Sequence, residues 1–98
     1  MEDREVIERV LAGDNDAFGL LVEKYQTKVY NLALRMSGSE DDAFDLSQES
    51  FLRAWRSLGS FQFESSFSTW LFRLSSNICL DFLRAKKRRG AVPWRPSR

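Results

Sequence analysis

The residue types best suited to ligand chemistry gather on one face of a predicted helix near the C-terminal end of the chain. At about 100° per residue, Trp70, Arg73 and Asn77 fall within one narrow sector, and Arg84 and Arg88 join them further along. Arginine binds phosphate bidentately, an asparagine amide pairs with base edges, and an indole offers a flat surface on which an unpaired base can stack. The pattern favours a single-stranded nucleic acid as ligand. The alternative is a surface helix whose tryptophan is half-buried core.

Two neighbouring segments extend this predicted surface. Residues 60–67 mix phenylalanine with small polar residues, and we interpret them as a loop whose Phe61 or Phe63 could enclose an unstacked base. The alternative is that both rings plug the end of a helical bundle. The run Lys86-Lys87-Arg88-Arg89 could clamp phosphates without sequence choice, or could only complement the dipole of its helix.

A second candidate surface is acidic and lies on an earlier predicted helix. The core-facing positions of that helix are predicted to be Phe44, Phe51, Trp55 and Leu58. The flank beside them carries Asp41, Asp45, Gln48, Glu49, Leu52 and Arg56. This flank is either a docking surface for a basic protein partner, with Leu52 as its apolar anchor, or an ordinary solvated helix face.

The usual metal and catalytic constellations are missing from the sequence. There is no histidine, and one cysteine, Cys79, can form neither an internal disulfide nor a zinc site. We therefore predict no metal, no cofactor and no enzymatic activity, and we interpret Cys79 as a small buried apolar residue of a protein in the reducing cytoplasm. No apolar run approaches the roughly 20 residues that cross a bilayer, which predicts no membrane insertion.

Charge is divided between the two halves of the 98-residue chain. Residues 1–50 carry twelve acidic and five basic side chains, whereas residues 51–98 carry two and ten, so the net charge of +1 hides two halves of opposite sign. This asymmetry predicts either two different partners or two halves that neutralise each other. With 43% hydrophobic residues, the chain can build one core.

The spacing of apolar residues is helical along most of the chain. It predicts a short helix around residues 6–11, a long helix over 17–36, a third over 40–57 with Ser39 as its N-cap, and a fourth from 67 into the basic run. No segment alternates with period two, so no sheet is predicted. The predicted fold class is all-α, a small bundle of three main helices plus a short N-terminal helix.

The motifs in these elements resemble those of bacterial sigma factors of the extracytoplasmic-function group. Residues 45–55, DLSQESFLRAW, resemble that group's D-L-x-Q-E-x-F-x-x-A-W, and residues 67–73, FSTWLFR, resemble F-x-T-W-L-[FY]-R. Asn77, Asp81 and Arg84 match the following N-x-x-x-D-x-x-R, and residues 13–18, GDNDAF, resemble G-D-x-x-A-F. The resemblance implies a sigma region 2 helical domain over residues 1–89. It also implies that residues 90–98 begin an interdomain linker or tail, and that the chain is a fragment without the domain that reads the −35 element.

The resemblance also implies the partners. The acidic helix would dock on the clamp helices of the RNA polymerase largest subunit, and the second surface would bind the −10 promoter element, mainly as the single non-template strand. The family positions that dock on polymerase are matched by Asp45, Gln48, Glu49 and Leu52. The positions around a flipped-out base are matched by Arg53, Phe61, Phe72 and Asn77. Members of this group are often held inactive by an anti-sigma protein.

Two sets of candidate residues result. The candidate DNA-binding residues are Arg53, Phe61, Phe63, Trp70, Phe72, Arg73, Asn77, Arg84, Lys86, Lys87 and Arg88. The candidate polymerase-binding residues are Asp41, Asp45, Gln48, Glu49, Leu52 and Arg56. The alternative function is a helical adaptor that binds only proteins, and an enzyme is a distant third.

Overall fold

Four α-helices follow one another in the computed structural model, which describes residues 2–90. They are α1 (Asp3–Leu11), α2 (Phe18–Ser37), α3 (Glu40–Arg56) and α4 (Phe67–Gly90). Short 3-10 turns precede α2 and follow α3, namely η1 (Asn15–Ala17) and η2 (Leu58–Ser60). No strand occurs among these described residues, and the predicted all-α fold class is confirmed. The predicted tail lies outside the described residues except for Gly90, which is the last residue of α4.

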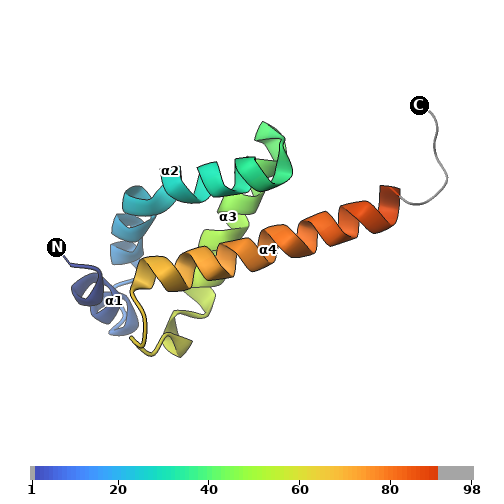
Figure 1. The fold of residues 1–98 in the computed structure, drawn as a ribbon. Coiled ribbons are helices and arrows are strands. Elements are labelled where there is room, and N and C mark those ends of the chain that lie inside the picture. The colour runs from blue at the N-terminus through green and yellow to red at the C-terminus, as the bar shows by residue number, and fades with distance from the viewer. Residues whose placement is uncertain (1, 91–98) are drawn as a thin grey trace.

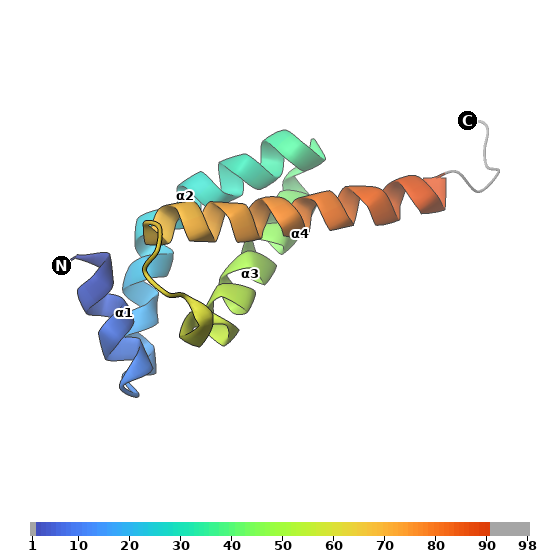
Figure 2. The same ribbon diagram turned by 60° about the horizontal axis from the view of Figure 1, so that its bottom comes forward.

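The helices pack as a bundle from which α4 projects. Helix α3 contacts both α2 and α4, and α1 lies beside the N-terminal part of α2 (Figure 1). The C-terminal half of α4 extends beyond the other helices, and the loop of residues 61–66 runs from η2 back to the start of α4 (Figure 2). One face of α4 is therefore open to solvent along most of its length.

The turn between α2 and α3 follows the chemistry of its residues. Gly38 ends α2 with φ of 72°, a left-handed conformation that glycine adopts at low cost. Ser39 then begins α3, because its Oγ accepts a hydrogen bond from the backbone N–H of Asp42 at 3.3 Å. The predicted N-cap is thus confirmed, and the acidic first turn of α3 suits the positive end of the helix dipole.

The buried face of α3 differs from the predicted one. Phe51 and Leu58 are buried as expected, but Phe44 is 56% exposed and Trp55 is 42% exposed. Four of the six buried positions of α3 are small, namely Ala43, Ser47, Ser50 and Ala54, and the other two are Leu46 and Phe51. Small side chains allow α3 to approach two helices at once, whereas large rings would hold the helices apart. The prediction that Phe44 and Trp55 belong to the core-facing stripe was therefore wrong.

The buried face of α4 contains two small residues besides its large ones. Leu71 is fully buried and Cys79 is 1% exposed, which confirms the interpretation of the cysteine as a small core residue. Burial raises the pKa of the Cys79 thiol above its ordinary value. Ser75 is equally buried, and its Oγ has no hydrogen-bond partner. An unpaired buried hydroxyl is unfavourable.

Helix α1 is held by both apolar and polar contacts. Its Val6, Ile7 and Val10 are buried in the same core cluster as Phe61 and Phe67. The carboxylate of Asp3 accepts a hydrogen bond from the Tyr25 hydroxyl. Its other oxygen forms an ion pair with Lys24 Nζ at 2.8 Å. Leu11, the last residue of α1, is 49% exposed and lies outside the core.

Candidate functional site

A cleft between the end of α3 and the first half of α4 brings together residues from separate motifs. Arg53 contributes from α3, and Trp70, Arg73 and Asn77 contribute from α4, with Ser57 and Ser60 at the η2 end. The cleft has a volume of about 370 Å³. Four of the predicted DNA-binding residues therefore line one cavity, although Arg53 lies far from the others in the sequence.

The lining side chains differ in exposure. Arg53, Arg73 and Asn77 are exposed, whereas Trp70 is half-buried. The indole of Trp70 packs on Phe61 and Phe67, with ring centroids 5.3 and 5.7 Å away. The tryptophan thus belongs partly to the core, as the alternative interpretation held, and it also lines the cleft.

Two ion pairs orient the cations around this cleft. Arg53 Nε donates to Glu49 Oε2 at 2.9 Å within α3, and Arg84 Nη1 donates to Asp81 Oδ1 at 3.1 Å within α4. Asp81 also lines the cleft beside Asn77. All four charged side chains keep 40% or more of their surface exposed, so each pair is weak and each guanidinium can exchange its carboxylate for a phosphate.

The predicted phenylalanines occupy three different environments. Phe61 is 6% exposed and plugs the bundle between Phe67 and Trp70. Phe72 is half-buried and packs edge-on against Tyr25 of α2, so the structure does not bring it to the cleft. Phe63 is half-buried at the loop and contacts Phe61.

The last turns of α4 carry the basic run. Lys86, Lys87 and Arg88 are exposed, and Lys86 Nζ lies 3.9 Å from Asp42 Oδ2 at the start of α3. This ion pair is the point at which the basic end of α4 meets the acidic start of α3. The C-terminal end of α4, which carries this run, projects past the bundle (Figure 1).

The acidic flank of α3 is open to solvent. Asp41, Asp45, Gln48 and Arg56 are exposed, Glu49 is half-buried, and Leu52 is 40% exposed. The structure thus places all six predicted polymerase-binding residues on an accessible part of one helix. The Asp42–Lys86 ion pair involves a residue of α3 that is not among these six.

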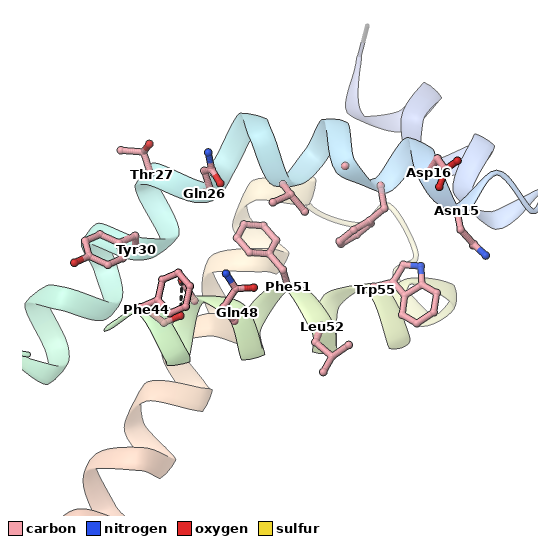
Figure 3. Close-up of a pocket in the computed structure, with 14 residues that line it drawn as sticks. Asn15, Asp16, Gln26, Thr27, Tyr30, Phe44, Gln48, Phe51, Leu52 and Trp55 are labelled. Carbon is pink, nitrogen blue, oxygen red and sulfur yellow. Dashed lines mark hydrogen bonds between the residues drawn. The ribbon is translucent and has the colours of Figure 1, made fainter. Parts of the chain in front are cut away.

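A groove of about 790 Å³ lies beside this flank, between α2 and α3 (Figure 3). Gln48 and Leu52 belong both to the predicted docking flank and to the groove lining. Phe44 and Trp55 line the groove as well, and Figure 3 shows Phe44 on the side of α3 that faces Tyr30 of α2. Sequence reasoning missed these two rings as surface residues. The available signal was that Phe44 and Trp55 share one helical stripe with Gln48 and Leu52, at intervals of four, four and three residues.

Comparison with known proteins identifies the fold and the family. The family model described as Sigma-70 region 2 matches residues 21–89. The chain belongs to this sigma factor family. An ECF RNA polymerase sigma-E factor of Haemophilus influenzae is 46% identical over 89 residues, which are 91% of this chain and 47% of the relative. This likeness places the domain in the extracytoplasmic-function group, whose members are transcription initiation factors and not enzymes.

Two solved structures share the architecture of the domain. An engineered region 2 of sigmaE in complex with GTAAAA matches with a TM-score of 0.84 and 42% identity over 94% of this chain and 96% of that one. CnrH in complex with the cytosolic domain of CnrY matches with a TM-score of 0.73 and 29% identity, covering 89% of this chain and 60% of that one. The chain spans about half the length of the curated relatives it matches.

None of the helices within residues 2–90 is long and apolar enough to span a membrane. No group of three or more His, Cys, Asp or Glu side chains in the same range is placed to hold a metal ion.

Proposed function

We propose that this domain docks on the core of RNA polymerase through α3 and holds the non-template strand of the −10 promoter element against α4, with one base flipped into the cleft. The observation that carries the proposal is the separation of two surfaces of opposite chemistry. Asp41, Asp45 and Glu49 lie on the same flank of α3 as Leu52. The cleft between α3 and α4 is lined by Arg53, Trp70, Arg73 and Asn77, and the two surfaces meet where Glu49 pairs with Arg53. One small domain thus offers separate contacts to a protein and to a nucleic acid.

The DNA half of the proposal is supported by the chemistry of the cleft. Asn77 supplies an amide that can pair with a base edge, and Arg53 and Arg73 supply guanidiniums for phosphate or base. Stacking a base on an aromatic side chain contributes about 1–3 kcal/mol, which is comparable to the few kcal/mol that unstacking a base costs. Contacts made only to the melted strand therefore offset the cost of opening the duplex, and no bond chemistry is required.

The solved complex of an engineered region 2 of sigmaE with GTAAAA supports the same ligand class for this chain. The two domains share their fold over nearly the whole length of both. We take the single-stranded hexamer d(GTAAAA) as the first probe of binding.

The polymerase half is supported by the composition of the α3 surface. Leu52, Phe44 and Trp55 form an exposed apolar ridge, and the carboxylates of Asp41 and Asp45 lie close to it on the same helix. An apolar centre with a charged rim is typical of a protein docking site, and the rim favours a basic partner. The clamp helices of the polymerase largest subunit are the proposed partner. A regulatory anti-sigma protein in the cytoplasm is proposed as a second one, in line with the CnrH–CnrY complex.

The DNA proposal is tested by replacing Asn77 with alanine. Wild-type domain and Asn77→Ala are titrated with d(GTAAAA) and with hexamers substituted at one base each. The variant is expected to lose about 1–3 kcal/mol of discrimination at one position. Asn31→Ala, which removes an exposed asparagine from α2, is the matched control. Equal base preference in Asn77→Ala and wild type would remove Asn77 from recognition. A domain that captures no single strand selectively would favour the adaptor function.

The docking proposal is tested by reversing two charges on α3. The double variant Asp45→Arg with Glu49→Arg is expected to bind purified core polymerase more weakly, because it repels a basic partner. The control reverses Glu5 and Glu23, which are exposed on α1 and α2 and change the net charge equally. Unchanged affinity of the α3 variant would show that this flank does not dock.

A further inference from the structure

A row of side chains connects α1 to the DNA-facing cleft. The Arg4 guanidinium carbon lies 4.1 Å from the centroid of the Phe63 ring, a cation–π distance. The Phe63 ring lies 4.7 Å from that of Phe61, and the Phe61 ring lies 5.3 Å from the Trp70 indole, which lines the cleft. The first helix of the domain therefore contacts the loop of residues 61–66, and the loop contacts the cleft.

The loop holds a backbone conformation that its residue disfavours. Phe63 has φ of 59°, and no other residue besides glycine has a positive φ in the described part of the chain. A bulky side chain in this left-handed region costs about 1–3 kcal/mol. Such a conformation persists only where surrounding contacts hold it.

The ends of the loop are fixed, but its middle depends on contacts to other elements. Phe61 is buried at one end, and at the other end Ser66 Oγ accepts a hydrogen bond from the Thr69 backbone N–H at 3.1 Å. Between them, the ring of Phe63 contacts both the Phe61 ring and the Arg4 guanidinium. Besides the packing of Phe63 against the core cluster, Arg4 is thus a polar contact from outside the loop that opposes relaxation of Phe63.

Helix α1 is a firm support for this contact. Val6, Ile7 and Val10 are buried, and Asp3 is held by Tyr25 and Lys24 of α2. The match to the sigma-70 region 2 family begins at residue 21, so α1 lies outside it. The Arg4 contact to the loop therefore comes from a part of the chain that the matched family model does not include.

We propose that Arg4 is a positioning residue for base recognition: its guanidinium holds Phe63 in the left-handed conformation and thereby keeps the loop of residues 61–66 in the shape that accepts the flipped base. The inference rests on the proposed function of the cleft. Arg4 itself touches no DNA in this scheme. It acts by raising the fraction of molecules whose loop is ready to bind.

The size of the effect follows from the contact. A cation–π interaction at an exposed site shifts a conformational equilibrium by about two- to fivefold. Arg4→Ala is expected to weaken binding of the preferred hexamer by at most this factor, and to weaken binding of hexamers with the wrong base at the flipped position less. The ratio of the two affinities, rather than affinity alone, is the quantity that identifies a recognition role.

The test has one arm without DNA and one with it. In the free domain, the φ-sensitive three-bond coupling between the amide and α protons of Phe63 is measured by NMR for wild type, Arg4→Lys and Arg4→Ala. Arg4→Ala is expected to shift the coupling away from the left-handed value, and Arg4→Lys to restore part of it. The same proteins are then titrated with d(GTAAAA) and its single-base variants.

Two controls separate the cation–π contact from loss of charge on α1. Arg9→Ala removes an equal charge from the same helix, and Glu8→Ala removes the carboxylate that lies 3.6 Å from Arg4 without removing Arg4. Neither is expected to change the coupling of Phe63. In a Phe63→Gly background, Arg4→Ala is expected to have no further effect on base discrimination, because glycine adopts the left-handed conformation without a clamp.

The outcomes distinguish this inference from the proposed function. If wild type prefers one base and Arg4→Ala keeps both the Phe63 coupling and that preference, the role of Arg4 is refuted while the function stands. A changed coupling with unchanged base discrimination also refutes it, since the loop would then move without affecting recognition. If wild type shows no base preference at all, the proposed function fails, and the role of Arg4 in recognition fails with it.

Discussion

Replacing Leu52 with alanine tests whether the ridge on α3 is a docking surface or a solvated helix face. Leu52 is 40% exposed on α3, and it lines the groove between α2 and α3. Most of the residue is already covered in the free domain, so its truncation is expected to lower the free energy of unfolding as well. The loss of binding is therefore measured with every variant fully folded, because it depends only on the part of Leu52 that a partner would cover.

The magnitude follows from the exposed fraction. Fully burying a leucine side chain contributes about 1.5–3 kcal/mol, so covering the remaining 40% contributes roughly 0.6–1.2 kcal/mol. Leu52→Ala is therefore expected to weaken binding to core polymerase about three- to eightfold. A larger loss would mean that the substitution also disturbs the neighbouring Trp55.

The assay is a titration of fluorescently labelled domain with purified core RNA polymerase, with urea unfolding of each variant alongside. Leu11→Ala is the matched control, because Leu11 is 49% exposed on α1 and does not line the groove. The reasoning is refuted if Leu52→Ala and Leu11→Ala bind polymerase equally well.

Four further measurements test the core, the titratable groups and the basic run. Ser75→Ala removes the unpaired buried hydroxyl and is expected to raise the free energy of unfolding by about 1 kcal/mol in urea titrations; a decrease would contradict this. Burial first, and then the hydrogen bond to Asp3, raises the pKa of Tyr25 above 10.0. The melting temperature should therefore change little as the pH approaches 10 and decrease above pH 10, because the fold disfavours tyrosinate. A melting temperature that stays constant above pH 10 would refute the raised pKa of Tyr25. Cys79, with its raised thiol pKa and its burial, should react with iodoacetamide slowly until urea unfolds the domain. Lys87→Ala should lower the slope of log affinity for single-stranded DNA against log salt by about 0.7, without changing base preference.

Helical periodicity predicted the secondary structure because that signal is local. The four helices and the Gly38–Ser39 turn follow from residues within a few positions of one another. The same spacing correctly predicted that Arg73 and Asn77 share a face of α4 with Trp70. The order of the motifs predicted the family.

The placement of α3 against its neighbours could not be obtained in this way. A hydrophobic stripe shows which residues are apolar, but the distance between helices decides which of them are covered. Here close packing selects Ala43, Ser47, Ser50 and Ala54 for the interior and leaves Phe44 and Trp55 on the surface. The rings predicted to be core became the lining of a groove.

The sequence by itself determined the helices, their charges and the residues that each face carries, because these depend on intervals of three and four residues. Only the tertiary structure decided that Arg53 joins Asn77 in one cleft and that Arg4 lies over the ring of Phe63. Both contacts join elements that are distant along the chain. They depend on how α1, α3 and α4 pack around a shared core, and no local pattern encodes that packing.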